Sequence, residues 1–503
     1  MKQSPVVVIG GGMAGLVAGY QLTLRGLRPL LLEQSAALGG AVARHTVAGL
    51  ELDSGAESFA VARPAVTDLL GDLGMSGAVV APAPLGAWVR HEAGSAPLPA
   101  TALLGIPGHL RAADVRRVIG WPGALRATMD AVLPPRFGDP TLGGLVRRRM
   151  GPRVLHRLVE PVVGGVHASD PSVLEVDAVA PGLTAAIGSA GSLAGAVRTL
   201  RGGAAPGAAV GGIRGGMALL PAALAAAIIT VGGEIRCEVT VSGLEAITDG
   251  WRVHVQGMTI DTAAVVVALP AAGINQLLGV VLGDAAMPAD SGRSTPVALV
   301  TMVIDDARLD AAPRGTGILV APRATGVQAK ALTHATAKWP WLAATLPAGR
   351  HVLRLSYGRS GFGDGAVGTA GNQGAANPTS ANPTSANPTS ANPTSANPTS
   401  ANPAAAIPAD GELPSIALAD ASTLLGVTLR ESDLLGSDVV RWPSSLPQAR
   451  QGHRATVARL RQAASSQSGL AVVGSTLAGT GLAAVVGDAR AQIDALADRL
   501  AAG

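Results

Sequence analysis

The chain has 503 residues, of which 48% are hydrophobic and 14% are charged, and its formal net charge is +4. This length is enough for two or three domains around a large buried core. The single cysteine, Cys237, excludes an internal disulfide and a thiolate metal cluster, and we expect no metal site. The small, dispersed basic excess argues against nucleic-acid binding.

The N-terminal segment predicts a dinucleotide-binding turn. Residues 6–9 are four β-branched residues, typical of a strand buried on both faces of a parallel sheet, and they run into a Gly-x-Gly-x-x-Gly pattern. The glycines permit a tight turn, close approach of a pyrophosphate and close packing of the following helix. A helix over 16–25 and a second apolar strand over 29–32 lead to Glu33, an acid suited to a ribose diol. The predicted cofactor contacts in this unit are Gly10, Gly11, Gly12, Met13, Ala14, Gly15, Glu33 and Gln34.

Small residues continue this pattern after Glu33. Residues 38–41 read Leu-Gly-Gly-Ala, and residues 53–55 read Asp-Ser-Gly. A turn of small residues beside a dinucleotide site lets an extended cofactor pass close to the backbone. The first strand begins within a few residues of Met1, so we expect no signal peptide and a cytoplasmic location.

The middle of the chain predicts helices first and strands later. Helical spacing dominates residues 106–200, for example over 142–150, whereas residues 264–269, 297–304 and 351–357 read as strands. Residues 234–241 and 251–255 predict a hairpin around the turn at 248–250. The apolar segments 217–233 and 470–487 contain proline or several glycines, so we expect no transmembrane span, while contact with a membrane surface stays open.

A low-complexity segment interrupts the C-terminal half. Residues 376–400 are five copies of Ala-Asn-Pro-Thr-Ser, and the wider stretch 361–412 lacks the large apolar residues that a core needs. This composition predicts a disordered surface insertion between a strand and a helix of one domain. A tolerated repeat expansion without function is the simplest interpretation, and an interaction tether is the alternative.

Read together, these motifs resemble the flavin-containing amine oxidase superfamily and, within it, the porphyrinogen oxidases. Residues 55–59 with Arg63-Pro64 are similar to that family's Gly-Pro-Glu-Ser-Phe and Arg-Lys-Pro segments. Residues 145–151, 160–170 and 441–453 are similar to three further family segments, and 474–481 to the glycine-rich start of its C-terminal helix. The resemblance extends the cofactor contacts to Gly40, Ala41, Gly55, Ala56, Glu57, Ser58, Val241, Trp442, Gly474, Gly481, Leu482 and Ala483.

The resemblance implies an α/β fold with three parts. A discontinuous Rossmann-like FAD-binding domain comprises residues 1–90, 214–272 and 438–503. A mainly helical domain covers 91–213, and a substrate-binding domain with a mixed sheet covers 273–437. The cofactor implied is FAD, which the family binds in an extended conformation.

The activity implied is oxygen-dependent oxidation of a porphyrinogen to a porphyrin, by three hydride transfers to flavin with peroxide as by-product. Coproporphyrinogen III is the substrate favoured, and protoporphyrinogen IX is the alternative. Another flavin amine oxidase or desaturase, or a protein that binds FAD or porphyrin without turnover, are further alternatives. The flavin carries the difficult step, so the resemblance names no catalytic side chain.

Basic side chains are the natural partners of the substrate's propionates. Lys330 is notable because Lys2, Lys330 and Lys338 are the only lysines in the chain. Molecular oxygen is the second substrate, and a monomer or a homodimer is expected. The candidate propionate partners are Arg44, Arg63, Arg90 and Lys330.

Overall fold

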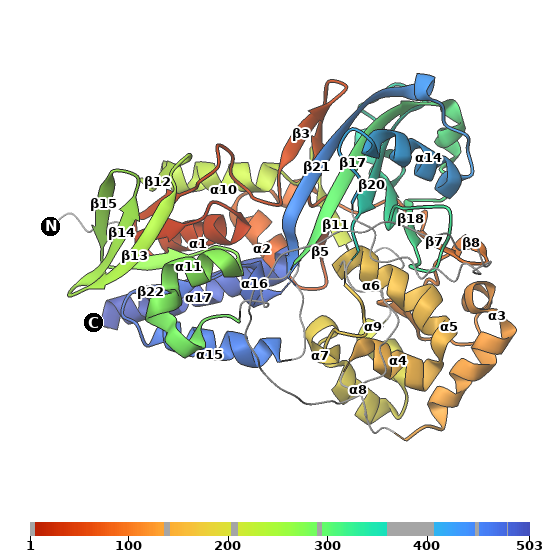
Figure 1. Ribbon diagram of the computed structural model, residues 1–503, viewed down its shortest axis with the longest axis horizontal. Helices are drawn as coiled ribbons and strands as arrows, with labels where there is room; N and C mark the ends of the chain where they lie inside the picture. Colours follow the sequence, from red (N-terminus) through yellow and green to blue (C-terminus); the bar gives the residue numbers. More distant parts are fainter. Residues whose placement is uncertain are drawn as a thin grey trace, which may run out of the picture.

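The computed structural model describes residues 6–134, 141–167, 169–202, 210–288, 294–359, 407–447, 452–479 and 481–502. Three parts of the chain lie side by side (Figure 1). A parallel sheet with helices on both faces forms one end, a large mixed sheet lies at the other end, and a helical bundle packs beside the mixed sheet.

The parallel sheet joins segments from across the whole sequence. All its strand pairs are parallel, in the order β12-β2-β1-β16-β22. The strands are short, and all except the edge strand β12 are buried. Crossover connections join them because parallel strands cannot be joined by a tight turn. Their bounds are β1 (Val6–Ile9), β2 (Pro29–Leu32), β12 (Glu234–Arg236), β16 (Val265–Val267) and β22 (Leu470–Val472).

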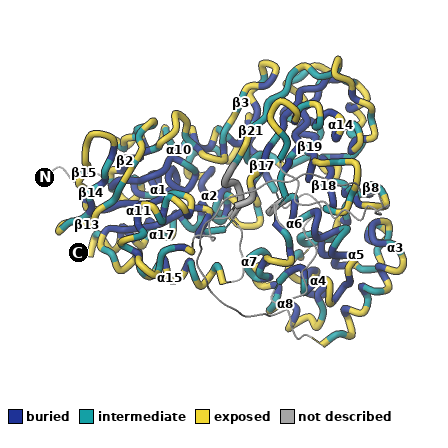
Figure 2. Tube along the Cα trace, viewed as in Figure 1, coloured by how far each residue is buried: buried dark blue, intermediate teal, exposed yellow. Residues whose placement is uncertain are grey.

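Separate apolar clusters cover the two faces of this sheet (Figure 2). One face packs against α1 (Met13–Leu24), α2 (Ala65–Asp72), α10 (Leu219–Thr230) and α17 (Leu482–Ala502). The other packs against α11 (Ala271–Leu282), α15 (His453–Ser465) and the antiparallel strands β13 (Val241–Ile247), β14 (Gly250–Val255) and β15 (Met258–Thr262). The predicted Rossmann-like unit is therefore present.

The predicted hairpin is shifted along the chain. Residues 234–236 add an edge strand, β12, to the parallel sheet, and β13 at 241–247 pairs with β14 instead. The prediction was wrong because the chain turns at Glu238, whose φ is +59°, and so leaves one sheet for the other. Alternation of apolar residues gave no sign of this turn.

The mixed sheet has seven strands in the order β21-β17-β20-β19-β18-β7-β8. Helix α14 (Leu413–Leu425) covers one face. The hairpin β3 (Arg44–Val47) and β4 (Leu50–Asp53), with α12 (Ala335–Lys338) and α13 (Pro340–Ala343), packs near the other. The strands are β21 (Leu434–Pro447), β17 (Ser294–Asp305), β20 (Arg350–Tyr357), β19 (Ala331–His334), β18 (Gly317–Val320), β7 (Trp88–His91) and β8 (Gly94–Pro97).

Two predicted domain boundaries fall inside strands of this sheet. The strand β7, at 88–91, crosses the boundary placed at residue 90, and β21 pairs with β17 from 434 to 447, across the boundary placed at 438. Continuous hydrogen-bonded pairing keeps each strand in one sheet. The fingerprint motifs could not reveal this, because they mark the cofactor site and not the sheet edges.

The helical part contains a buried ion pair. Arg149 is 2% exposed, and its Nε donates to Asp130 Oδ1 at 2.5 Å. Asp130 also accepts from the backbone N–H groups of Leu193 and Ala194, so it caps α9. The bundle comprises α3 (Ala113–Thr128), α4 (Leu142–Met150), α5 (Pro152–Val154), η3 (Leu155–Val159), α6 (Glu160–His167), α7 (Val176–Val179), α8 (Leu183–Ala190) and α9 (Leu193–Arg201).

Short elements connect these three parts. They comprise the sheet β5-β11-β6, the pair β10-β9, helix α16 and five 3-10 turns. Their bounds are β5 (Phe59–Ala60), β6 (Val79–Val80), β9 (Ala102–Leu103), β10 (Ile106–Pro107), β11 (Val210–Ile213), α16 (Ser475–Ala478), η1 (Ser76–Ala78), η2 (Met129–Ala131), η4 (Gly283–Ala285), η5 (Ala307–Ala311) and η6 (Glu431–Asp433).

The predicted insertion 361–412 lies largely outside the described residues. Residues 407–412 are described, and they pack on the mixed sheet: Ile407 joins its apolar cluster, and Asp410 accepts from Arg441 Nε at 2.5 Å. The segment predicted as disordered therefore extends six residues too far. A single isoleucine in an Ala- and Pro-rich stretch was too weak a signal for packing.

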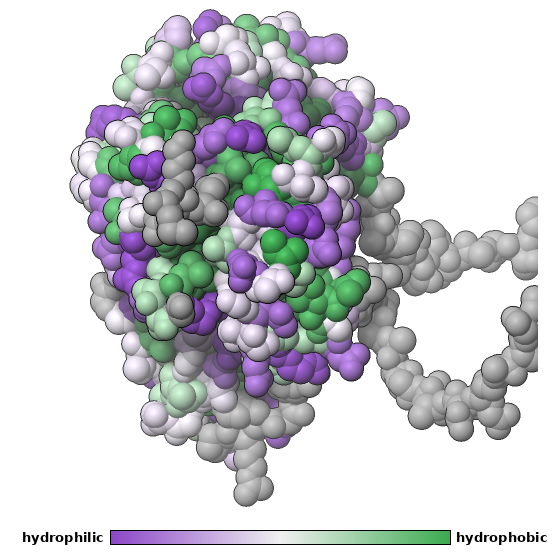
Figure 3. Space-filling view, turned by 90° about the vertical axis from the view of Figure 1, so that its left-hand side faces the viewer, coloured by the Kyte–Doolittle hydropathy of each residue, from purple (hydrophilic) through white to green (hydrophobic). Residues whose placement is uncertain are grey.

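On the face shown in Figure 3, apolar side chains form small patches among polar ones. Within the described ranges, none of the helices combines the length and apolar character needed to cross a bilayer.

Candidate functional site

The glycine turn after β1 has the shape that a pyrophosphate requires. Gly10 has a φ of +107°, and a Cβ on Gly15 would lie 1.8 Å from the Gly10 carbonyl oxygen, so α1 begins directly against the turn. A Cβ on Gly12, by contrast, would meet no protein atom within 4 Å. Gly12 is the N-cap of α1 and supplies no side-chain cap, which leaves the first N–H groups of the helix for a ligand.

The Glu33 carboxylate lies at the end of β2 and already has protein donors. Its Oε2 accepts from the Gly11 N–H at 2.6 Å, and its Oε1 accepts from the N–H of Ser35 at 2.8 Å and from its hydroxyl at 2.7 Å. A carboxylate has about four acceptor positions, so a ribose hydroxyl can still bind here. Gln34 beside it is exposed.

Three glycine-containing segments lie side by side next to this turn. Gly39 donates its N–H to the Gly11 carbonyl at 2.8 Å, and a Cβ on Gly40 would lie 3.3 Å from the Gly12 Cα. Ala41 then accepts from the Ala56 N–H at 2.9 Å, and a Cβ on Gly55 would lie 2.0 Å from the Ala41 carbonyl oxygen. We call this series, 10–15, 39–43 and 54–58, the glycine track.

The C-terminal segments reach the far end of the glycine track. Trp442 Nε1 donates to the Ser54 carbonyl at 3.2 Å, and its ring lies 3.3 Å from the Cβ position of Gly55. Helix α17, which begins at Leu482, packs against β5 directly after Ser58. The predicted contacts Gly481, Leu482 and Ala483 are therefore brought to the Ser58 end of the track.

Val241 approaches the opposite end. The segment before it pairs with the end of β2: Val239 donates to the Glu33 carbonyl at 2.9 Å, and Glu238 donates to the Ser35 carbonyl at 3.1 Å. Val241 follows within two residues and is partly buried. It therefore lies on the same side of the track as the ribose-type acid.

A charged cluster around Glu57 joins the track to the mixed sheet. Glu57 Oε2 accepts from Arg354 Nη1 at 2.8 Å, its Oε1 accepts from Lys338 Nζ at 2.5 Å, and Arg354 Nη2 donates to the Gly55 carbonyl at 2.7 Å. Burial alone would raise the pKa of Glu57, but the two cations lower it to about 2. Glu57 is thus a permanent anion that fixes the track against β20.

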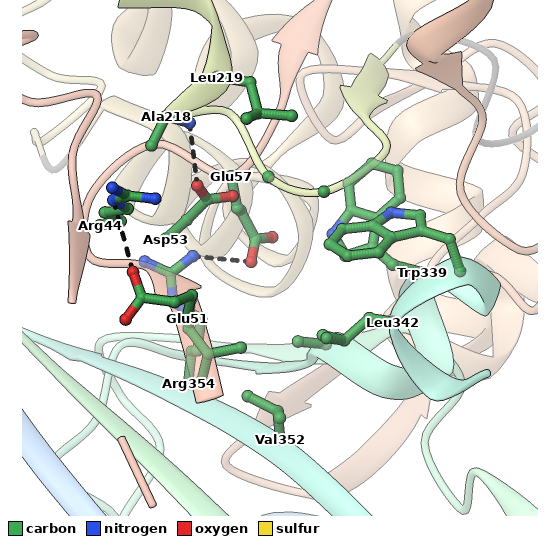
Figure 4. A pocket seen from close by; sticks show the side chains of 15 residues that line it. Arg44, Glu51, Asp53, Glu57, Ala218, Leu219, Trp339, Leu342, Val352 and Arg354 are labelled. Atoms are coloured by element: carbon green, nitrogen blue, oxygen red, sulfur yellow. Dashed lines mark hydrogen bonds and ion pairs between the residues drawn. The ribbon is translucent and has the colours of Figure 1, made fainter. Parts of the chain in front are cut away.

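Asp53 lies next to this cluster and holds the start of α10. Its two oxygens accept from the Met217 N–H at 3.1 Å and the Ala218 N–H at 3.3 Å, and burial raises its pKa. Figure 4 shows Asp53, Glu57 and Arg354 on one side of a pocket, with Trp339 and Leu342 on the other. Both carboxylates are committed to structural partners, so they hold backbone segments in place.

The structure separates the four predicted propionate partners. Arg44 lines the pocket of Figure 4 and pairs with Glu51 at 3.4 Å, with 67% of its side chain exposed. Arg63 is exposed just before α2. Arg90 and Lys330 lie on opposite sides of Val320 in the mixed sheet, where Lys330 is 3% exposed.

Three further cations, Lys338, Arg354 and Arg359, were not predicted from the sequence. Arg354 carried a usable signal, because it is a cation inside the otherwise apolar strand β20, and such a residue needs a partner. Arg359 follows the end of that strand, and its Nη2 donates to the Val320 carbonyl at 2.9 Å. The sequence did not indicate that Glu57, 297 residues from Arg354, would be the partner.

These residues fit a flavin dinucleotide. The open Cβ position of Gly12 and the free helix N-terminus suit the pyrophosphate, and the track of glycine and alanine backbone suits an extended cofactor. When bound, FAD supplies hydride-accepting chemistry. Among the described residues there is no group of three or more His, Cys, Asp or Glu side chains that could hold a metal ion.

Comparisons with known proteins agree with this geometry. The family model "Flavin containing amine oxidoreductase" matches residues 13–315. The coproporphyrinogen III oxidase of Mycobacterium leprae is 29% identical over 99% of both chains. The chloroplastic protoporphyrinogen oxidase of rice is 27% identical over 70% of this chain and 68% of its own.

A solved structure supports the fold over the whole length. A protein from Exiguobacterium sp. 255-15 superposes with a TM-score of 0.78 at 23% identity, covering 99% of both chains. The family match covers more than half of the present sequence, and it includes α1, the segments 39–43 and 54–58 of the glycine track, and Glu57. The chain therefore belongs to the flavin-containing amine oxidoreductase family and is an FAD-dependent oxidoreductase.

Proposed function

We propose that this protein oxidises coproporphyrinogen III to coproporphyrin III, with FAD as cofactor and molecular oxygen as electron acceptor. The observation that carries the proposal is the similarity to a coproporphyrinogen III oxidase over 99% of both chains. A match of that extent covers the mixed sheet and the helical bundle as well as the dinucleotide turn.

We further propose that FAD lies along the glycine track. The pyrophosphate would bind at Gly12 and the start of α1, the ribose would bind near Glu33, and the flavin would lie near Gly55, Trp442 and Gly481. The support is the open space at Gly12 and the contacts that join these three segments. Arg354, Lys338 and Glu57 would keep the mixed sheet at a fixed distance from the flavin end.

The chemistry suits a site without an acid–base pair. In a porphyrinogen, hydride loss from a methylene bridge gives a cation that the adjacent pyrroles stabilise, and three such oxidations with proton loss give the porphyrin. When bound, FAD would supply the hydride-accepting chemistry, and molecular oxygen would take the electrons to give peroxide. The protein then has to bind and orient the porphyrinogen and to exclude water. Glu57 and Asp53 both accept hydrogen bonds from protein groups, which is consistent with a structural role for the two carboxylates.

The deciding experiment supplies the FAD-loaded protein with coproporphyrinogen III or protoporphyrinogen IX and follows porphyrin fluorescence. We expect a higher kcat/KM with coproporphyrinogen III, together with peroxide formation. FAD-free protein is the control for spontaneous oxidation.

Each other outcome identifies an alternative. Faster turnover of protoporphyrinogen IX would favour the activity named for the rice relative. Turnover of an amine alone would favour a different oxidase of the same family. A protein that binds FAD tightly but oxidises neither porphyrinogen nor amine would be a non-catalytic flavoprotein.

A further inference from the structure

Two buried cations lie close together at one end of the mixed sheet. Val320, the last residue of β18, connects them: its N–H donates to the Lys330 carbonyl at 2.9 Å, and its own carbonyl accepts from Arg359 Nη2 at 2.9 Å. Lys330 is 3% exposed, and Arg359 is partly buried. The positive charge of Arg359 acts on Lys330, and burial intensifies the repulsion between like charges.

The protein supplies little negative charge here. Among the residues that the structure describes, no hydrogen bond or ion pair reaches the Lys330 ammonium. Glu160 on α6 is the carboxylate whose charge acts on Arg359, and its Oε1 is already 2.6 Å from His156 Nδ1. Burial, and after it Arg359, lowers the pKa of Lys330 to about 7, as expected for an ammonium that lacks an anion.

The pair lies where the mixed sheet meets the helical bundle. A Cβ on Gly165 of α6 would lie 2.7 Å from Leu319 Cδ2, so the helix backbone packs directly against the residue before Val320. This junction borders the same sheet whose strand β20 carries Arg354 to the Gly55 end of the glycine track.

Positions along the strands give the distance of Lys330 and Arg359 from the level of Arg354. Arg354 pairs with Thr333 in the antiparallel ladder of β20 and β19, and Arg359 and Lys330 both lie toward the same end from that pair. At roughly 3.3 Å per residue, Lys330 is about 10 Å from this level and Arg359 about 16 Å. A tetrapyrrole with extended propionate arms spans this kind of distance, so its ring can lie near Gly55 while one carboxylate reaches the cations.

Building on the proposed function, we propose that Lys330 and Arg359 together bind one propionate carboxylate of the porphyrinogen. Arg359 Nη2 donates to the carbonyls of Val320 and Ala329, and the carboxylate accepts hydrogen bonds from the ammonium and from the remaining guanidinium N–H groups. It thereby neutralises a buried charge pair that the described protein leaves unbalanced.

The test measures binding of coproporphyrin III, the stable product, and of its tetramethyl ester to FAD-loaded protein by fluorescence quenching. In Lys330→Met and Arg359→Met, affinity for the free acid should fall about ten- to a hundredfold, whereas affinity for the ester should stay unchanged. Lys330→Arg should recover most of the loss. Arg323→Gln is the matched control, because Arg323 is an exposed cation on the same connection between β18 and β19.

Flavin absorbance and melting temperature establish that each variant is folded, and Lys330→Gln replaces the methionine variant if that one is unstable. Folded variants that bind the free acid as tightly as the parent protein would overturn the inference and leave the proposed function intact. A parent protein that neither binds coproporphyrin III nor oxidises its porphyrinogen would instead refute the proposed function, and this inference with it.

Discussion

Arg354 and Glu57 form an ion pair of 2.8 Å between the middle of the mixed sheet and the glycine track. Lys338 binds the second oxygen of the same carboxylate, so one anion holds two cations, one from α12 and one from β20. The side chains of Glu57, Lys338 and Arg354 are 17%, 15% and 8% exposed. This cluster joins the mixed sheet and α12 to the 54–58 segment of the glycine track.

Glu57→Gln should destabilise the protein by about 3 kcal/mol, because it leaves two partly buried cations without their anion. Chemical denaturation of the FAD-free protein gives the value directly. Glu51→Gln is the control: Glu51 pairs with Arg44 at the surface, and its loss should cost about 0.5 kcal/mol or less. Equal losses in the two variants would contradict the structural role of Glu57.

The same carboxylate predicts a pH dependence. The pKa of Glu57 is lowered from 4.5 to about 2 in the folded protein, so its contribution is complete above about pH 5 and is lost as the pH falls toward 2. The stability difference between the parent protein and Glu57→Gln should therefore be constant near neutrality and shrink on acidification. A difference that stays constant down to about pH 3 would show that Glu57 is not a salt-bridged anion.

The glycine turn predicts opposite results for two identical substitutions. Gly15→Ala places a Cβ 1.8 Å from the Gly10 carbonyl and should prevent stable folding. Gly12→Ala meets no protein atom within 4 Å, so the protein should fold normally and lose FAD affinity about tenfold or more, because the methyl group occupies the space proposed for the pyrophosphate. Melting temperature and flavin retention after gel filtration separate the two effects, and normal FAD binding by Gly12→Ala would place the pyrophosphate elsewhere.

Trp442→Phe should keep the apolar contact with Gly55 but remove the donor to the Ser54 carbonyl. The expected loss of stability is about 1 kcal/mol, with a shift of the flavin absorbance spectrum because the ring lies at the proposed flavin end of the track. A loss of stability without any spectral shift would place the flavin away from Trp442.

Deleting residues 376–400 should leave the fold and the activity intact. The chain leaves the mixed sheet at Gly358 and returns beside it, since a Cβ on Gly358 would lie 3.0 Å from Ile407 Cδ1. A shorter connection between two adjacent points costs little, and loop length affects stability only logarithmically. Melting temperature and kcat/KM should stay within error of the parent protein, and a clear loss in either would assign the repeats a role.

Arg441→Gln provides the contrast, because Arg441 holds the return of this connection through Asp410 Oδ1 at 2.5 Å and the Pro408 carbonyl. It should lower the melting temperature although it lies outside the repeats. The pair of experiments separates the anchored end of the connection from its repeated part.

Local pattern predicted much of this protein correctly. The strand β1, the glycine turn, the helix α4 and the apolar strand β20 were all expected, because each depends on neighbouring residues and a fixed spacing. The shifted hairpin at β13 and the strands that cross the predicted boundaries were missed. Those depend on which sheet a segment joins, and alternation along one strand does not encode its partner.

The sequence by itself determined a dinucleotide-binding unit. Gly10, Gly12, Gly15 and Glu33 act through backbone shape and one carboxylate within a single βαβ unit, so a local pattern is enough to indicate a dinucleotide cofactor. Only the tertiary structure decided that Glu57 holds Lys338 and Arg354, and that Lys330 and Arg359 both contact the backbone of Val320. Ion pairs and unbalanced buried charges depend on distances in space between residues far apart in the chain. For those residues, the sequence lists the charges and the fold decides which of them meet.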